Sequence, residues 1–94
     1  MSANNGEDDL VRRRKRLKFR SWHRGTKEMD LLLGPFADAC LDGFDAPLLA
    51  EYEALLEVPE PDLYDWILGR APPPASARSS VLDRLIARYA GNAR

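Results

Sequence analysis

Residues 29–40, with the sequence MDLLLGPFADAC, decide the fold class of this chain. Apolar side chains recur in this stretch at the i, i+3, i+4, i+7 spacing that places them on one face of an α-helix. The spacing predicts a helix over about residues 26–41. Proline removes a backbone donor and clashes with the preceding turn, so a kink or break is expected at Gly34-Pro35. Gly43 should end the helix.

One further helix is predicted before this one and another after it. Residues 7–21 lack proline and glycine and place acids before arginines, as the helix dipole prefers, with Leu10 and Leu17 on a thin apolar stripe. The later helix begins near Asp45, a good N-cap, with Pro47 in its first turn, and ends before Pro59.

Two short helices are predicted in the last third of the chain. Residues 61–68 place Leu63, Trp66 and Ile67 on one face, and Gly69 should stop that helix. Residues 71–77 include three consecutive prolines and predict a stiff extended linker. The last helix should begin at Ser80, in a capping box with Asp83, and end at Gly91.

Together these patterns predict an all-α fold, a compact five-helix bundle in a single domain, because no segment shows the alternation of a strand. The length of 94 residues suffices for one domain and is too short for two. We expect residues 1–9 to be a flexible acidic tail, residues 10–91 to form the domain, and residues 92–94 to be a short tail.

Composition limits the possible sites and compartments. The single cysteine and single histidine exclude an internal disulfide and a Cys/His metal cage, and Cys40 is expected to be a buried thiol. No stretch approaches the roughly 20 apolar residues of a membrane span. The polar start, with its three acids, resembles neither a secretory signal nor a mitochondrial presequence. A bacterial cytoplasmic location is therefore expected in preference to the mitochondrial matrix.

Charge is distributed unevenly along the chain although the net charge is only −1. Residues 10–27 hold nine of the fourteen Lys and Arg residues and no acid, whereas residues 28–94 hold twelve acids against five bases. Such asymmetry influences how a partner is steered more than it influences the fold.

No catalytic constellation is recognisable in the sequence. Nucleophilic catalysis needs a nucleophile held by a base that a third group orients, and no local signature supports one here. No phosphate-cradling glycine loop or dinucleotide fingerprint is present either. The chain is therefore expected to be no enzyme and to carry no cofactor of its own.

The basic segment 12–28 admits three interpretations. Its cations can form a solvated face whose stems cover apolar neighbours, with Gly25 as the N-cap of the next helix and Glu28 reaching back to its amide. Alternatively, basic and aromatic side chains together suit a small nucleic-acid-binding or antitoxin-like regulator, although the acidic remainder of the chain argues against this. The third interpretation is a protein interface: Phe19 and Trp22 lie off the core stripe, flanked by Arg20 and Arg24, with the composition of a hot spot.

At these residues the chain resembles the SdhE family, the flavinylation or assembly factors of succinate dehydrogenase. The family's R-G-x-x-E motif is matched by residues 24–28, RGTKE. Residues 20–23, RSWH, and 29–36, MDLLLGPF, match its flanks, and residues 55–56 with 61–67, PDLYDWI, resemble a later block. The similarity covers roughly residues 10–90.

The resemblance implies a five-helix domain that helps covalent FAD attachment to the flavoprotein subunit of succinate dehydrogenase, and often of fumarate reductase. The client, not the factor, would then carry the flavin. Arg24, Gly25 and Glu28 carry over directly from the motif, and Trp22, His23 and Asp30 adjoin it. We expect a monomer that binds its client through these residues, with the anchors named above beside them.

Overall fold

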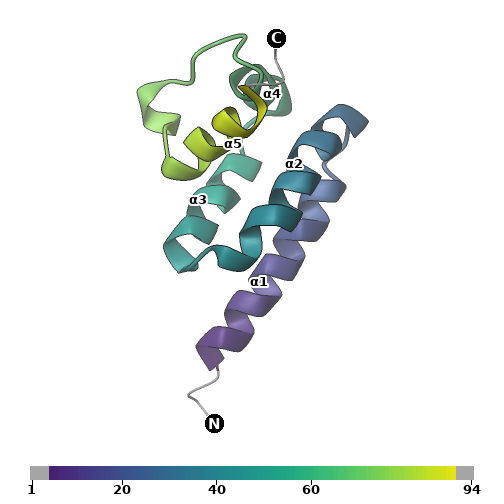
Figure 1. Ribbon diagram of the computed structural model, residues 1–94, viewed down its shortest axis with the longest axis vertical. Coiled ribbons are helices and arrows are strands. Elements are labelled where there is room, and N and C mark those ends of the chain that lie inside the picture. The colour runs from purple at the N-terminus through teal and green to yellow at the C-terminus, as the bar shows by residue number, and fades with distance from the viewer. Residues whose placement is uncertain (1–4, 91–94) are drawn as a thin grey trace. The chain divides into compact units, whose positions relative to one another are not determined.

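The computed structural model describes residues 5–90, with side chains from Asp8 onward. These residues form α1 (Asn5–Trp22), α2 (Lys27–Cys40), α3 (Ala46–Leu56), α4 (Glu60–Ile67) and α5 (Ser80–Ala90), with short 3₁₀ turns η2 (Leu41–Gly43) and η3 (Ala75–Ala77) (Figure 1). No residue between 5 and 90 lies in a strand. The predicted all-α class and its five helices are confirmed.

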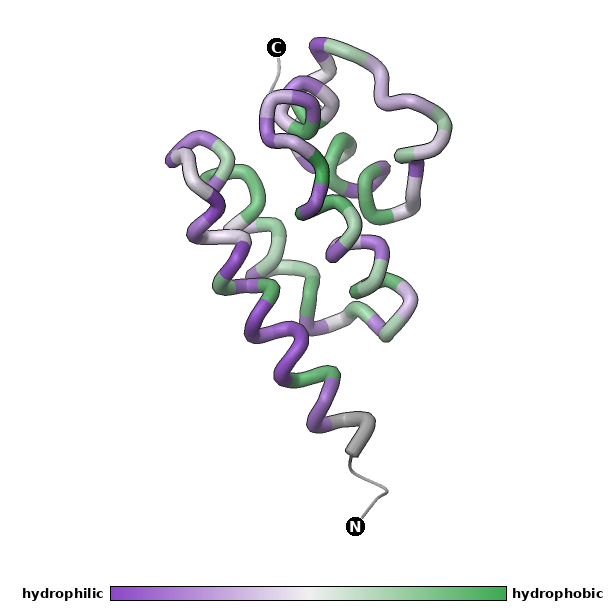
Figure 2. The backbone as a smooth tube through the Cα atoms, turned by 180° about the vertical axis from the view of Figure 1, so that it is seen from behind, coloured by the Kyte–Doolittle hydropathy of each residue, from purple (hydrophilic) through white to green (hydrophobic). Residues whose placement is uncertain are grey.

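The chain divides into two compact units, Met1–Leu49 and Ala50–Arg94, and the division falls within α3. In the first unit α1 and α2 lie side by side as an antiparallel hairpin, and η2 follows (Figure 1). Figure 2 shows that α1 is largely hydrophilic along its length, whereas α2 is more apolar. The hairpin therefore depends on α2 for most of its core.

The core of the first unit is built from the face of α2 that the periodicity predicted. Its fully or almost fully buried apolar side chains are Leu17, Met29, Leu33, Phe36, Ala37, Leu41, Phe44 and Leu49. Phe36 and Phe44 meet edge to face with ring centroids 6.2 Å apart, a favoured aromatic geometry. The buried Ser21 hydroxyl donates to the Leu17 carbonyl at 2.7 Å, so this polar group is satisfied within α1.

The second unit buries the inner faces of the later helices. Its core consists of Tyr52, Leu55, Leu56, Leu63, Ile67, Val81, Leu82 and Leu85. Gly69 ends α4 as predicted, at a φ of +75°. The Arg70 N–H donates to the Asp65 carbonyl at 2.8 Å and the Gly69 N–H donates to the Trp66 carbonyl at 3.2 Å. This pair of bonds is a Schellman motif.

The start of α5 is held by a side chain from α3. The Glu51 carboxylate accepts from the Ser80 hydroxyl at 2.8 Å and from the Val81 N–H at 3.1 Å. The Ser79 hydroxyl accepts from the Leu82 N–H at 3.1 Å. The predicted N-cap at Ser80 is therefore wrong by one residue: Ser79 caps the helix and Ser80 binds Glu51 instead.

Other boundaries differ in detail from the prediction. The N-cap at Asp45 is confirmed, because its carboxylate accepts from the Leu48 N–H at 3.1 Å. The predicted break at Pro35 is absent and α2 continues through it. Pro35 removes the donor to the Leu31 carbonyl, and Leu31 lies on the exposed side, where water can replace the lost bond. Cys40 is half-buried, not buried.

The ends of the chain were predicted less well. Helix α1 begins at Asn5, inside the stretch 1–9 that was expected to be a flexible tail. The rest of that tail, the helix stop at Gly91 and the tail 92–94 lie outside the described residues. Within the linker, η3 interrupts the expected extended conformation.

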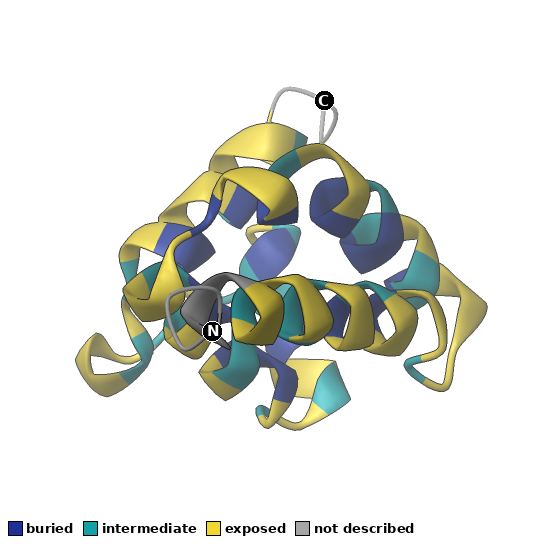
Figure 3. Cartoon of the chain, turned by 90° about the horizontal axis from the view of Figure 1, so that it is seen from below, coloured by how far each residue is buried: buried dark blue, intermediate teal, exposed yellow. Residues whose placement is uncertain are grey.

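Each helix has both buried and exposed residues, and Figure 3 shows this alternation along the chain. No helix between residues 5 and 90 has the length and apolar character needed to cross a bilayer.

Candidate functional site

Residues 23–26, which we call the α1–α2 corner, connect the two helices of the hairpin. Gly25 has a φ of +137°, beyond the left-handed helical region that other residues sometimes adopt. The Arg24 N–H donates to Asp30 Oδ1 at 2.7 Å, so a carboxylate one turn into α2 ties down the backbone before the glycine. The corner is thus a fixed turn that requires glycine at its centre.

Helix α2 begins where the spacing predicted, but its cap is not the Gly25 of the structural interpretation. Thr26 is the N-cap, with φ −123° and ψ 148°, and its hydroxyl accepts from the Met29 N–H at 3.3 Å. Gly25 is not the cap, because its positive φ is unlike the extended conformation that a cap adopts. Glu28 is consequently the second residue of the helix, one place too early for the expected capping box.

The corner is accessible to another molecule. Gly25 and Glu28 are exposed and Arg24 is half-buried. The Glu28 carboxylate makes no hydrogen bond or ion pair with any residue that the structure describes. Asp30, which was a weaker candidate for partner contact, is half-buried and holds the corner from inside. Of Glu28 and Asp30, Glu28 is therefore the acid whose carboxylate is available to bind another molecule.

A stacked pair of rings joins the last turn of α1 to the corner. Phe19 is 64% exposed, whereas Leu17 is 2% exposed, which confirms that Phe19 lies off the core stripe. The rings of Phe19 and His23 stack with centroids 4.1 Å apart and planes inclined by 18°. His23 Nδ1 lies 2.8 Å from the Phe19 carbonyl oxygen, which can only accept, so Nδ1 carries the proton. The exposed pair is held rigid by two contacts. Arg20 is also exposed.

The second predicted aromatic anchor, Trp22, is arranged differently. Its indole N–H donates to Asp38 Oδ2 at 3.1 Å, and Gly34 lies directly beneath its ring. The side chain remains 37% exposed. Sequence reasoning missed Gly34 and Asp38 as neighbours of the corner. The one available signal was a glycine inside an otherwise periodic helix, which often marks a close approach by another group.

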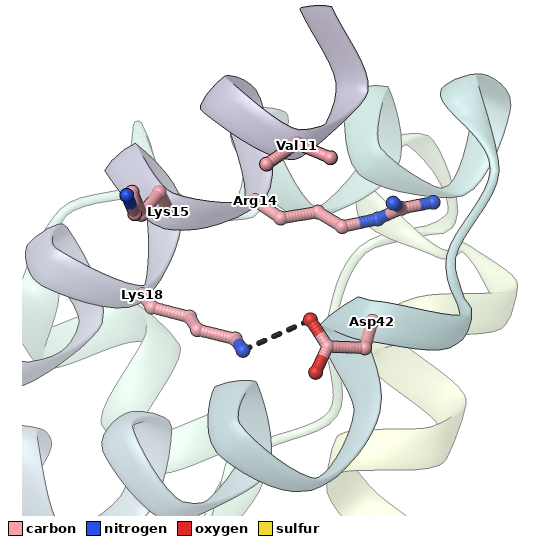
Figure 4. A pocket seen from close by; sticks show the side chains of 5 residues that line it. All are labelled: Val11, Arg14, Lys15, Lys18 and Asp42. Atoms are coloured by element: carbon pink, nitrogen blue, oxygen red, sulfur yellow. Dashed lines mark hydrogen bonds and ion pairs between the residues drawn. The ribbon is translucent and has the colours of Figure 1, made fainter. Parts of the chain in front are cut away.

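Part of the basic run has a structural role. Arg14 donates to the Phe44 carbonyl at 2.8 Å, and Lys18 forms an ion pair with Asp42 at 2.9 Å. A hollow of about 190 Å³ is lined by Val11, Arg14, Lys15, Lys18 and Asp42, and its cations do not converge on one point (Figure 4). The structural interpretation of the run therefore accounts for Arg14 and Lys18, which are half-buried instead of forming part of a solvated face. Further exposed cations of α1 are Arg12, Lys15 and Arg16.

Residues that could hold a metal do not gather in this region. Across the described part of the chain, no three His, Cys, Asp or Glu side chains lie together in a group suited to a metal ion. The corner offers the half-buried Arg24 guanidinium and the exposed Gly25, and beside it lie the exposed Glu28 carboxylate and the aromatic side chains of Phe19 and Trp22. This combination suits recognition of a protein surface.

Comparison with known proteins identifies the family. A family model described as the flavinator of succinate dehydrogenase matches residues 15–89. The chain is 46% identical over 80 residues to the FAD assembly factor SdhE of Acetobacter pasteurianus, covering 85% of this chain and 73% of that protein. No solved structure matches it significantly.

Mitochondrial proteins are also similar. The chain is 36% identical over 92 residues to the mitochondrial succinate dehydrogenase assembly factor 2 of Dictyostelium discoideum, covering 98% of this chain and 64% of that protein. It is 38% identical over 74 residues to the protein of the same name from Schizosaccharomyces pombe, covering 79% of this chain and 53% of that one. With relatives in bacteria and in mitochondria, and with most of its length matched, the chain belongs to the family of succinate dehydrogenase flavinators.

Proposed function

We propose that this chain binds the flavoprotein subunit of succinate dehydrogenase and assists the covalent attachment of FAD to it, through a surface centred on the α1–α2 corner. The observation that carries the proposal is the family match over residues 15–89, which contains the half-buried Arg24 and the exposed residues 25–28. The names of the relatives support the client, since they are called assembly factors for FAD or for succinate dehydrogenase.

The chemistry of the corner supports recognition of a folded client. Arg24 can pair with a carboxylate or phosphate through two parallel bonds, and the Glu28 carboxylate can hold a basic group. Gly25 permits close approach of a client backbone. Phe19, stacked on His23, supplies an aromatic surface of the kind that dominates binding energy in protein interfaces.

The proposed mechanism needs no catalytic group on this chain. A factor that binds one conformation of its client more tightly than another shifts the client's population toward that conformation. If the favoured conformation is the one in which the flavin and its attachment residue meet, attachment accelerates. The proposal thus assigns the FAD to the client and no cofactor or enzymatic step to this chain.

The proposal extends to clients and setting. We propose that the chain acts as a monomer in the bacterial cytoplasm and also serves the fumarate reductase flavoprotein, as the resemblance implies. Sedimentation of the purified chain, alone and with each flavoprotein, tests the monomeric state and the binding of each client. One chain per flavoprotein in the complex is the expected result, and a stable dimer of the free chain would contradict the monomer.

The test is co-expression with the succinate dehydrogenase flavoprotein, scored by in-gel flavin fluorescence and by co-purification. Glu28→Ala should lower the affinity for the client by about tenfold, equal to ~1.4 kcal/mol, and both signals should fall with it. Asp83→Ala is the control, because it also removes an exposed acid from the first turn of a helix. The ion pair with Arg78, at 3.5 Å, that this variant breaks is exposed and contributes little to stability. Normal client fluorescence with Glu28→Ala would count against the proposed surface. Normal fluorescence in the complete absence of this chain would count against the function.

The nucleic-acid alternative predicts a different outcome. It requires a gel shift with duplex or single-stranded nucleic acid that weakens steeply with salt. Two cations of the run, Arg14 and Lys18, are used within the first unit, and Phe19 stacks on His23. We therefore expect no specific shift at physiological ionic strength.

A further inference from the structure

The indole of Trp22 lies against α2 at a position where only glycine leaves room for it. A Cβ atom built on Gly34 would lie 2.4 Å from both Cδ2 and Cε2 of the Trp22 ring. Real Cβ atoms do not approach other atoms so closely, and these two atoms belong to the middle of the indole instead of its edge. Gly34 is buried beneath the ring, although it lies in a helix where alanine would be intrinsically favoured.

A hydrogen bond to Asp38 sets the orientation of the indole ring against Gly34. Its Oδ2 accepts from the indole Nε1–H at 3.1 Å. Because α1 and α2 run antiparallel and side chains lean toward the N-terminus of their own helix, the Trp22 side chain extends along α2 away from the corner. The ring is thereby held at two points, by van der Waals contact with Gly34 and by a directed hydrogen bond to Asp38.

Three residues of α2 hold this end of α1. Asp30, Gly34 and Asp38 are spaced four residues apart and therefore lie along one stripe of the helix. Asp30 accepts from the Arg24 N–H at 2.7 Å, and the other two hold Trp22. The stripe thus grips the chain immediately before Gly25, on both sides of His23.

We propose that Gly34 and Asp38 are positioning residues for client binding: they seat the Trp22 indole, and the seated indole fixes the end of α1 from which the α1–α2 corner projects. The inference rests on the proposed function, since it concerns the same surface. Trp22 is the last residue of α1, so moving its side chain moves the backbone that leads into Arg24 and Gly25. Neither Gly34 nor Asp38 needs to touch the client for this role.

The decisive variant is Gly34→Ala. The new methyl group displaces the indole and breaks its bond to Asp38, while the intrinsic preference of α2 for helix increases. The seat is therefore disturbed without weakening the helix that carries it. Gly43→Ala is the matched control, because its Cβ meets nothing within 4 Å and its φ is not positive.

The position of the indole can be measured directly. In a Trp66→Phe background, all tryptophan fluorescence comes from Trp22. Acrylamide quenching of Trp22 should rise about twofold in Gly34→Ala, because a displaced ring is more accessible to solvent. Affinity for the succinate dehydrogenase flavoprotein should fall about tenfold, equal to ~1.4 kcal/mol. Gly43→Ala should leave both values unchanged.

Conservative rescue separates positioning from general packing. Asp38→Asn keeps an oxygen acceptor for the indole N–H and should retain quenching and client affinity close to those of the unsubstituted chain. Asp38→Leu has similar bulk without an acceptor and should resemble Gly34→Ala. In a Trp22→Ala background, Gly34→Ala should cause no additional loss, since the colliding ring is already absent.

The outcomes divide clearly. Unchanged quenching in Gly34→Ala would overturn the seat itself. Increased quenching with unchanged client affinity would overturn the positioning role and leave the contact as packing alone. If the unsubstituted chain does not bind the flavoprotein at all, the proposed function fails and with it the positioning role, while the quenching data still test the contact between Trp22 and Gly34.

Discussion

Two turns of this molecule depend on a glycine with positive φ, and they are built in opposite ways. The hydrogen bonds that close the turn at Gly69 join backbone groups, from Arg70 and Gly69 to carbonyls of the last turn of α4, and the Arg70 guanidinium also lies over the Tyr64 ring. The turn at Gly25 is closed by side chains, since Asp30 accepts from the Arg24 N–H and Thr26 from the Met29 N–H. A backbone motif stops a helix almost anywhere, whereas side-chain closure specifies one geometry.

The difference bears on function. At Gly69 the conformation serves to end α4, and a Cβ there would meet no atom within 4 Å. At Gly25 the φ of +137° is more restrictive than the +75° of Gly69, and the exposed Glu28 lies beside it. We take the first turn to be structural and the second to be a presented surface. Paired substitutions can break or sharpen this distinction.

The largest effect is expected for the glycines themselves. Gly25→Ala should destabilise the fold by about 1–3 kcal/mol, and Gly69→Ala by about 1 kcal/mol, because alanine is strained at both positions and more so at the first. Urea unfolding measures both. Client flavinylation should fall strongly in Gly25→Ala and remain near normal in Gly69→Ala. Equal flavinylation by the two variants would remove the functional half of the comparison.

A smaller effect should separate the two aspartates beside these turns. Asp30→Ala removes the acceptor of the Arg24 N–H and should cost about 1–2 kcal/mol of unfolding free energy. Asp65→Ala should change stability by less than about 0.5 kcal/mol, because that turn uses the backbone carbonyl of residue 65 and not its carboxylate. Asp30→Asn keeps an acceptor and is the control. A similar loss for both alanine variants would contradict the contrast between a turn closed by a side chain and one closed by the backbone.

The smallest difference in stability between the two regions is expected for their helix caps, Thr26 and Ser79, whose loss should have similar effects. Thr26→Ala and Ser79→Ala should each cost about 1 kcal/mol, since each hydroxyl accepts from an N–H in the first turn of its helix. Thermal unfolding measures both losses, and a difference of more than about 1 kcal/mol between them would contradict this expectation.

Local sequence signals predicted the parts of the fold that depend on local physics. The apolar spacing of residues 29–40, the N-cap at Asp45 and the stop at Gly69 each act within a few residues, and all are confirmed. The break that was one of the two outcomes expected at Pro35 is absent, because the cost of a missing donor depends on which side of the helix faces water. The cap was misplaced to Gly25 because glycine tolerates many conformations, and only the structure gives its φ.

The candidate site was predictable in composition but not in its connections. The exposure of Phe19 followed from its angle around α1 relative to Leu17. The bond from Trp22 to Asp38 joins residues sixteen apart, and no local pattern specifies such a pair. Asp30 stood out as a neighbour of the motif, yet its role in holding Arg24 depends on how the chain turns at Gly25.

The grip of Glu51 on the first residues of α5 has a practical consequence. One carboxylate of α3 pins the far end of the proline-rich connection, and the Schellman turn at Gly69 pins the near end. Because each end of the connection is anchored separately, the number of residues between the two anchors can change without altering α4 or α5. A peptide epitope or a reporter inserted at the exposed Ser76 should leave both anchorages intact, which makes this loop the natural point at which to label the protein.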